Sequence, residues 1–559
     1  PENTIISGTN YNAYAKNVVV KSTGTFELQA GNNLTVTDFI KVETGGVFNV
    51  KNNASILQLT DVANTGIVNI ERITQPMNYY DYTYWNSPVT AGSNFTFASL
   101  SPGTSSDIWS YSATIAGKSG NWVNLTPSTV MLPTKGYIVK APDTFSSNPA
   151  TKVAYTATFV GTPNNGPIYA PVSKGLNADI AELLVDDEDD EWNLIGNPYP
   201  SGIDAKAFLD LPANVDVVDG TIYIWTHNTP PSAAAPDPFY GDYVLNYTSE
   251  DYASFNKTGA TGTASSATTG GTAPTGFIAS GQSFFVRAST AMANGTTANA
   301  TFNNSMRVGG KNSDFFKKRN SSKNISATEE KHRIWLNLTN NSGAFSQTLV
   351  GYITGATQDL DRGYDGESFG GNTVTFYSII PQANLTIQGR SLPFDQNDVV
   401  PLGFNATKKG NYSIRIDHLD GVLNNENIYL EDKLLNVTHD LKQKPYTFST
   451  KVGTFDDRFV LKYNNNKTLS VEENIIKTND IQIAHIQNNN TIIIKNMITS
   501  VNVEKVTLYN ILGQSISSWK IENQDQQNIQ IPINSISSGI YVAKLKTSTG
   551  EISKKIIIQ

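Results

Sequence analysis

The stretch Thr23-Gly24-Thr25-Phe26 recurs as Thr44-Gly45-Gly46-Val47 and as Thr65-Gly66-Ile67-Val68, and the glycine returns after 21 residues each time. Each Thr-Gly pair is followed by a short run in which apolar and polar side chains alternate, as in a β-strand. Short strands that return with a fixed period are typical of a β-solenoid, in which each repeat forms one coil. Residues 1–78 are therefore predicted to form the end of a β-solenoid, with a plain β-meander as the alternative.

The chain begins at Pro1, without Met and without the apolar segment of a signal peptide. A first coil at Pro1 would have no cap. We therefore expect residues 1–78 to be the C-terminal end of a longer solenoid, or to be covered by other residues.

A second repeat spans residues 79–310, with halves at about 79–165 and 180–310. Its motifs keep their order in both halves: a strand with Trp and Asn-Pro, a second Trp-bearing strand, a Gly-aromatic strand and a Thr-Phe strand. The matching segments are Trp85 with Trp192, Ile108–Tyr111 with Ile222–Trp225, Lys135–Lys140 with Gly281–Arg287, and Thr156–Phe159 with Ala300–Phe302. This repetition predicts one antiparallel β domain that arose by duplication.

Composition limits the classes of function. The chain has 559 residues, 16% charged residues and a net charge of -8, which argues against a nucleic-acid-binding protein because such proteins carry a basic face. It has no cysteine, so disulfides, thiolate metal sites and cysteine nucleophiles are excluded. No stretch approaches the roughly 18 apolar residues of a transmembrane segment.

The remaining chain is predicted to form two further β units. Residues 311–330 are rich in Lys, Asn and Ser and indicate a linker, and alternating segments in 331–463 indicate a β-sandwich. Residues 464–480 indicate a second linker, and 481–559 contain six or seven short strands. The predicted fold class is all-β: short β-solenoid coils, a duplicated antiparallel β domain, a β-sandwich and a C-terminal immunoglobulin-like β-sandwich.

The C-terminal unit resembles the type A sorting domain of the type IX secretion system of Bacteroidota. The resemblance depends on the order, spacing and terminal position of four segments: Val506–Gln514, Ile531–Ile533, Ser538–Leu545 and Lys554–Ile558. The Trp192–Pro200 block and the solenoid also resemble regions of large surface proteins of flavobacteria, which include gliding-motility adhesins.

The resemblance implies a route and a set of partners. Such cargo crosses the outer membrane and reaches the cell surface or the extracellular space. It implies that residues 481–559 are read by the type IX translocon and a PorV-type shuttle barrel, and that a sortase-like peptidase processes the domain. The residues expected to form the sorting signal are Leu508, Tyr509, Asn510, Gly513, Gln514, Gly539, Tyr541, Lys554 and Lys555. Gly513 and Gly539 would permit tight turns beside a strand edge that a partner protein recognises, or would simply shape the sandwich.

Two acidic clusters are candidate Ca²⁺ sites. The segment 359–367 offers Asp359, Asp361 and Asp365 in a loop-like spacing, although it lacks the third acidic ligand and the final Glu of an EF-hand loop. A salt-bridged turn around Arg362 is the alternative. The run Asp186–Glu191 could also collect Ca²⁺, but a solvated loop is the stronger interpretation. We expect no required cofactor, with Ca²⁺ as the one candidate.

Tyr79, Tyr80, Tyr82, Tyr84 and Trp85 form an aromatic cluster that could stack on surface glycans or cover the end of the solenoid. We find no H-E-x-x-H or Walker motif. The sequence therefore predicts an exported, non-enzymatic, adhesin- or stalk-like cell-surface protein. The alternatives are a polysaccharide-binding module, or a polysaccharide-degrading enzyme whose catalytic part lies upstream of residue 1 or within residues 79–310.

Overall fold

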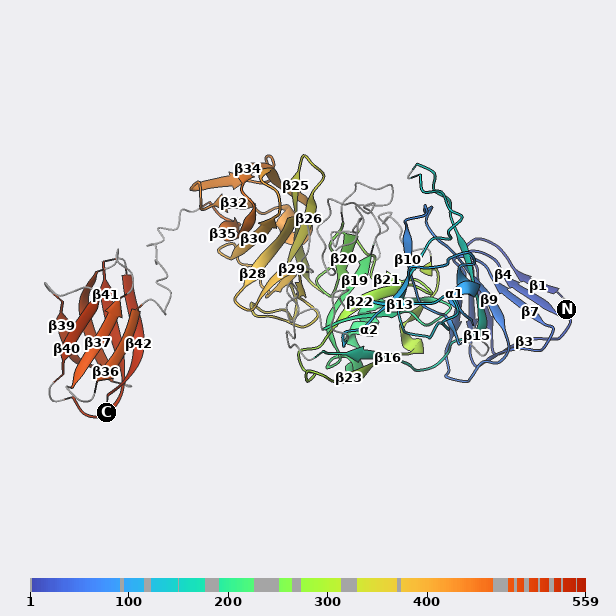
Figure 1. The fold of residues 1–559 in the computed structure, drawn as a ribbon, viewed down its shortest axis with the longest axis horizontal. Helices are drawn as coiled ribbons and strands as arrows, with labels where there is room; N and C mark the ends of the chain where they lie inside the picture. The colour runs from blue at the N-terminus through green and yellow to red at the C-terminus, as the bar shows by residue number, and fades with distance from the viewer. Residues whose placement is uncertain are drawn as a thin grey trace. The chain divides into compact units, whose positions relative to one another are not determined.

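A computed structural model describes residues 3–558, except for 91–94, 115–121, 149, 176–190, 226–250, 264–272, 313–328, 369–373, 466–480, 487–489, 497–501, 511–512, 522–526, 534–535 and 549. The chain divides into two compact units, Pro1–Asn465 and Asn466–Gln559. Strands dominate both units, which confirms the all-β fold class (Figure 1). Among the described residues, no helix is long and apolar enough to cross a membrane.

The solenoid is confirmed. Its coils stack as three parallel ladders, and Asn side chains continue the stacking between coils, as in the hydrogen bond from Asn33 Nδ2 to Asn12 Oδ1 (2.8 Å). Gly45 and Gly66 turn the chain with φ of +92° and +90°, a conformation that favours glycine. The ladders are β1 (Asn3–Ile6), β4 (Thr25–Leu28), β7 (Val47–Val50) and β9 (Val68–Ile73); β2 (Asn12–Ala15), β5 (Asn33–Val36) and β8 (Ser55–Gln58); and β3 (Val18–Val20) with β6 (Ile40–Val42).

The last coil is covered by later parts of the chain. Strand β15 (Thr156–Pro163) pairs antiparallel with β9, and β11 (Val89–Thr90) pairs with β15. On another side, Arg307 donates to the carbonyl of Ile56 (2.6 Å), and Asn312 donates to that of Ala54 (2.5 Å). The duplicated domain therefore supplies the C-terminal cap of the solenoid.

The duplicated domain is confirmed by two four-stranded sheets of identical topology. The first has the order β10 (Tyr82–Trp85), β14 (Tyr137–Lys140), β12 (Ile108–Tyr111), β13 (Trp122–Leu125). The second has the order β17 (Trp192–Gly196), β22 (Ser283–Ala288), β19 (Val218–Trp225), β20 (Tyr252–Phe255). A short helix follows the first strand of each half: α1 (Phe97–Leu100), capped by Thr96, and α2 (Ala205–Asp210), capped by Asp204.

The registers correct one detail of the repeat. Tyr82 lies opposite Lys140 in the first half, and Trp192 lies opposite Arg287 in the second. Trp192 is therefore equivalent to Tyr82, not to Trp85 as the Trp-Asn similarity suggested. The motif match was shifted by three residues because the similar Trp-Asn side chains do not occupy equivalent strand positions in the two halves.

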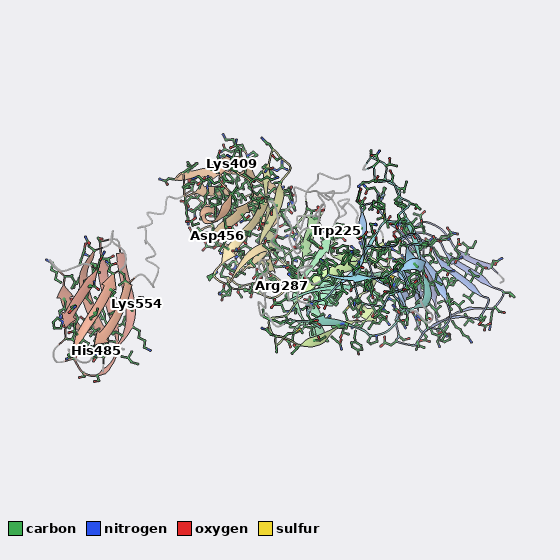
Figure 2. The ribbon with its side chains drawn as sticks, viewed as in Figure 1. Trp225, Arg287, Lys409, Asp456, His485 and Lys554 are labelled. Atoms are coloured by element: carbon green, nitrogen blue, oxygen red, sulfur yellow. The ribbon has the colours of Figure 1, made fainter. Side chains whose placement is uncertain are left out.

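The two halves face each other with approximate two-fold symmetry. Trp85 bridges to Gln282, and the equivalent Ile195 bridges to Lys135. Between the sheets lies an aromatic core in which Tyr84 stacks on Trp225 with ring centroids 4.9 Å apart (Trp225 is labelled in Figure 2). Its buried members are Tyr84, Tyr111, Trp192, Leu194, Tyr223, Trp225 and Phe285.

Shorter elements complete this domain. Strand β16 (Ile168–Ser173) pairs with β23 (Thr297–Phe302), and β18 (Gly202–Asp204) pairs with both β21 (Phe277–Ile278) and β24 (Arg307–Val308). A 3-10 turn at Pro212–Asn214 lies between α2 and β19, and another at Asn304–Met306 lies between β23 and β24.

Residues 331–463 form one 11-stranded sheet that folds over its main apolar core, and Trp335, Leu349 and Ile387 form a smaller separate cluster. The strand order is β33-β32-β35-β30-β28-β29-β26-β25-β31-β34, and β27 pairs with β29. The strands are β25 (Lys331–Asn340), β26 (Phe345–Ile353), β27 (Gly366–Glu367), β28 (Val374–Ile380), β29 (Ala383–Arg390), β30 (Val399–Ala406), β31 (Gly410–Leu419), β32 (Tyr429–Asp432), β33 (Val437–Asp440), β34 (Tyr446–Thr450) and β35 (Gly453–Lys462). A 3-10 turn, Gly421–Asn424, follows β31.

The C-terminal unit is a two-layer sandwich of seven strands, drawn in red in Figure 1. One layer has the order β36 (Ile481–Ile486), β37 (Thr491–Asn496), β40 (Asn528–Pro532). The other has the order β39 (Ser515–Lys520), β38 (Val503–Asn510), β41 (Gly539–Thr547), β42 (Gly550–Ile558). Isoleucine, valine and leucine side chains from both layers fill the core between them.

Candidate recognition site in the C-terminal sandwich

The residues predicted to form the sorting signal come from three segments that the fold brings together. Strands β38, β41 and β42 are neighbours, and their register places Tyr509 opposite Val542 and Val542 opposite Lys555. Asn510 lies opposite Tyr541 in the same ladder. The predicted residues therefore share one end of one sheet, although the three segments lie far apart in the sequence.

The pleat of the sheet divides these residues between its two faces. Leu508 is fully buried and Tyr541 is 9% exposed, and both face the sandwich core. Tyr509, Val542 and Lys555 alternate with them and form one row on the outer face of the sheet. Lys554, labelled in Figure 2, is partly buried on edge strand β42. Leu508 and Tyr541 therefore stabilise the sandwich, while the outer row can contact a partner.

The turn after β38 is closed by its own side chains. Asn510 Oδ1 accepts a hydrogen bond from the Gln514 backbone N–H (2.9 Å), and Asn510 Nδ2 donates to Gln514 Oε1 (2.9 Å). Gly513 has φ of +78° with open space around the position of a Cβ. Gly513 thus has a backbone conformation that favours glycine, and the side chains of Asn510 and Gln514 bond to each other beside the outer row.

Gly539 and Tyr541 form a second small structure at the start of β41. The Tyr541 hydroxyl donates to the Ser537 carbonyl (2.8 Å), which ties the ring to the chain entering the strand. A Cβ on Gly539 would lie 3.4 Å from the same ring. This is an ordinary van der Waals distance, so the ring alone does not require glycine at this position.

This sheet offers a protein partner two kinds of contact. The outer row presents an aromatic, an aliphatic and a cationic side chain along one line. In the described sheets β39 lies at the end of the strand order and pairs with β38 alone, so its other edge is available for strand addition. The arrangement suits recognition by shape and main-chain pairing.

Two carboxylates of the predicted Ca²⁺ loop accept hydrogen bonds from backbone N–H groups. Asp365 Oδ1 accepts from the Gly389 N–H (2.8 Å), and its Oδ2 accepts from the Asp361 N–H (2.6 Å). Asp361 accepts from the Thr357 N–H, and Asp359 is exposed. Burial raises the pKa of Asp365 to about 7. Within the described residues, no group of three or more His, Cys, Asp or Glu side chains is placed to hold a metal ion. The Ca²⁺ site stays a prediction.

Arg362 docks this loop onto the second half of the duplicated domain. Its guanidinium donates to the carbonyls of Val218 (2.9 Å) and Leu209 (3.1 Å), rather than to a carboxylate as the salt-bridged turn would require. Close by, Trp335 Nε1 donates to the Ala260 carbonyl (2.7 Å). The loop therefore joins two modules.

A chain of ion pairs crosses the same interface. Arg287, labelled in Figure 2, contacts Glu367 of the sandwich (2.6 Å) and Glu191 (2.7 Å), and Lys174 also contacts Glu191 (3.0 Å). Glu191 belongs to the predicted acidic run and is buried, so this residue is not part of a solvated loop. Asp186–Asp190 lie outside the described residues. Sequence reasoning missed Arg287 and Glu367, although a cation inside the apolar run Phe284–Ala288 is a signal of a buried ion pair.

The aromatic cluster at 79–85 is divided between two cores. Tyr84 belongs to the aromatic core between the halves, and Trp85 packs on Phe159 next to the solenoid (centroids 5.6 Å apart). Only Tyr80 of the five is classed as exposed, at 40%. The cluster therefore joins modules, and its glycan-stacking role has little exposed surface on which to act.

Comparison with known proteins gives a match for each unit. Residues 1–463 match the family described as "Domain of unknown function (DUF8693)", and residues 486–559 match the "Secretion system C-terminal sorting domain". No curated protein matches the chain. A solved structure described as "Biofilm associated protein - BSP domain" is similar at 10% identity, covers 86% of this chain and 91% of its own, and has a TM-score of 0.12, too low to carry an argument. The sorting-domain match confirms the function predicted for the last unit.

Proposed function

The chain belongs through residues 1–463 to the family described as Domain of unknown function (DUF8693), and from this premise we propose that it is a non-enzymatic, adhesive or stalk-like protein of the cell surface. Its type IX sorting domain makes it a cargo of that secretion system, exported across the outer membrane to the cell surface or the extracellular space. The finer steps are part of the proposal: recognition by a PorV-type shuttle barrel and processing by a sortase-like peptidase.

The observation that supports a non-enzymatic role is the structural use of the buried charged groups. Arg287 joins the duplicated domain to the sandwich, and Lys140 contacts Asp107 (2.8 Å) and Asp143 (3.3 Å) within the first half. In the sandwich, Arg458 contacts Asp432 (2.8 Å) and lies over the rings of Phe448 and Phe459. In these three places the charged groups join strands or modules, and this structural use supports the non-enzymatic proposal.

The alternatives differ in measurable ways. A glycan array with the full chain separates a binding module from a stalk, and incubation with surface polysaccharides followed by a reducing-sugar assay tests for an enzyme. We expect no release of reducing ends. Turnover that is lost when a carboxylate pair is substituted would replace the non-enzymatic proposal with the polysaccharide-degrading one.

Deletion of residues 481–559 tests the export role. The truncated chain should accumulate in the periplasm, and the same segment fused to a foreign passenger should bring that passenger to the surface. Fractionation and surface labelling measure both results. Surface display that survives the deletion would contradict the role of this domain.

Two substitutions test which residues of the domain the secretion machinery recognises. Tyr509→Ala combined with Lys555→Glu alters the outer row without touching the core, so the full chain should melt at the same temperature but export poorly. Lys495→Glu is the matched control, because Lys495 is exposed on the opposite layer of the sandwich. Equal export of the control and the double variant would remove the outer row as the recognition surface.

A further inference from the structure

Three strand connections, which we call tips, gather at one end of the 331–463 sandwich: 407–409 between β30 and β31, 451–452 between β34 and β35, and the turn 433–436 of the β32–β33 hairpin. Register pairs Ala406 with Gly453 and Gly410 with Thr450, so the tip at 407–409 lies beside the tip at 451–452. Arg458 links the third tip, 433–436, to the tip at 451–452. The Lys433 N–H donates to the Arg458 carbonyl (2.9 Å), and the Arg458 guanidinium donates to the Ser449 carbonyl (3.1 Å), two residues before Lys451. We call these three tips the basic end of the sandwich.

The basic end carries four exposed lysines: Lys408, Lys409, Lys433 and Lys451 (Lys409 is labelled in Figure 2). Among the ion pairs of the described residues none involves these four, whereas Lys462 of the same sheet pairs with Glu431. The nearby acidic residues are Asp456, which accepts a hydrogen bond from the Tyr377 hydroxyl (2.7 Å), and Asp457. The end therefore has a net positive charge in a chain whose total charge is -8.

Aliphatic side chains project between these lysines. Leu434 is 69% exposed, Leu435 is 58% exposed and Val452 is 61% exposed. The leucines are held in solvent by a rigid turn, because Asp432 Oδ1 accepts from the backbone N–H groups of Leu434 (3.0 Å) and Leu435 (3.3 Å). Asp432 is itself buried and held by Arg458 and by the Tyr446 hydroxyl (2.9 Å). The turn that carries the two leucines is therefore firmly anchored. Leucines that such a turn holds exposed to solvent indicate an interaction surface.

We propose that the basic end binds an anionic lipid surface. Lysines are attracted to the negative headgroups, and aliphatic side chains at the same depth can enter the boundary between headgroups and acyl chains. The charge is complementary to such a surface and opposite to that of the chain as a whole, so it would orient the protein with this end toward the lipid. An anionic polysaccharide would use the lysines but would gain little from three exposed aliphatic side chains.

This inference goes beyond the proposed function. It assigns a lipid-contacting end to the 331–463 sandwich, whereas export depends on the C-terminal sandwich. Failure of lipid binding would leave the export role and the non-enzymatic character unchanged.

Co-sedimentation of the full chain with lipid vesicles tests the proposal. Vesicles of equal parts phosphatidylcholine and phosphatidylglycerol should bind the chain, whereas vesicles of phosphatidylcholine alone should not. The variant Lys408→Glu/Lys409→Glu/Lys451→Glu should weaken binding on the order of 100-fold, because each lysine near an anionic membrane contributes about a factor of five. The variant Leu434→Ser/Leu435→Ser should weaken it about tenfold through lost insertion.

Lys442→Glu/Lys444→Glu is the matched charge control, since both lysines are exposed in the loop between β33 and β34, away from the three tips. It should bind nearly as the unmodified chain does. The proposal is overturned if the control and the triple variant lose affinity equally, or if both vesicle types bind alike. It is also overturned if anionic vesicles fail to bind, or if binding is lost in the lysine variant but unchanged in the leucine variant, which would indicate a polyanion partner instead.

Discussion

The two halves of the duplicated domain place a buried cation at the same position and use it differently. Lys140 ends β14 opposite Tyr82, and Arg287 occupies the equivalent place on β22 opposite Trp192. Lys140 pairs with Asp107 and Asp143 of its own half, and these acids retain 37% and 30% of their side-chain exposure. Arg287 pairs with the buried Glu191 and, across a module boundary, with Glu367.

The difference follows from what each half contacts. The first half supplies β15 to the solenoid sheet, so its cation remains internal. The second half carries the sandwich, and its cation became part of that contact. An arginine suits the second position because its planar guanidinium offers separate nitrogens, Nη2 to Glu191 and Nη1 to Glu367, whereas the single Nζ of Lys140 contacts both of its acids. One fold was thus used twice, and the copies diverged where they meet different neighbours.

The largest effect should come from Arg287→Met. The substitution leaves Glu367 without its partner and leaves Glu191 with Lys174 alone in a buried site, and breaking such a pair costs about 3–5 kcal/mol. Lys140→Met is the matched variant, and it should cost about 1–2 kcal/mol because Asp107 and Asp143 can be rehydrated. Urea unfolding followed by tryptophan fluorescence measures both, since six of the seven tryptophans lie in residues 1–465. Equal losses would show that the two cations have equivalent roles.

Gly220→Ala should have the next largest effect. Gly220 has φ of +101°, and a Cβ there would lie 2.5 Å from the Gly363 nitrogen of the docking loop. Strain and collision together should cost about 3 kcal/mol. Gly103→Ala in the first half is the control, because Gly103 has φ of +89° but nothing within 4 Å of its Cβ, so only about 1 kcal/mol of backbone strain is expected. If both variants lose the same stability, the contact with Gly363 does not hold the modules together.

The sequence predicted features that depend on local periodicity. The 21-residue return of Thr-Gly specified the solenoid because each coil repeats the same corner, and the order of the aromatic strands revealed the duplication. The C-terminal motifs predicted residues that do meet on β38, β41 and β42, because antiparallel pairing brings the segments together. In each case, patterns within short segments of the sequence were enough to predict the feature.

Features that depend on contacts between modules could not be predicted in this way. The segment Asp359–Glu367 has the spacing of a metal loop, but its carboxylates bind backbone N–H groups and its arginine binds carbonyls of another module. That outcome depends on which surface lies opposite, about which the segment itself contains no information. The three-residue shift between Trp85 and Trp192 has a similar origin, since side-chain similarity was matched without knowledge of the strand register.

The smallest predicted effect is on the pH dependence of stability, and it again differs between the two halves of the duplicated domain. Asp219 stands three residues before Ile222, at the place where the first half has the neutral Ser105 three residues before Ile108. Burial, only partly opposed by Arg287, raises the pKa of Asp219 to about 7. A carboxyl whose pKa is higher in the folded chain stabilises it fully below the unfolded pKa of about 3.9, and this contribution is lost as the pH rises through 7.

Asp219→Asn should therefore remove a pH dependence that the second half has at this position. The amide oxygen of the new side chain would still accept from the Thr221 N–H, which Asp219 binds at 3.1 Å, while the charge would be gone. The stability difference between the variant and the unmodified chain should change by on the order of 1–2 kcal/mol between about pH 5 and pH 8, with the variant favoured at the higher pH. Urea midpoints at several pH values measure it. A constant difference across that range would mean that Arg287 keeps Asp219 ionised throughout, and the interface would then be a fixed network of charges that responds to the loss of a partner but not to protons.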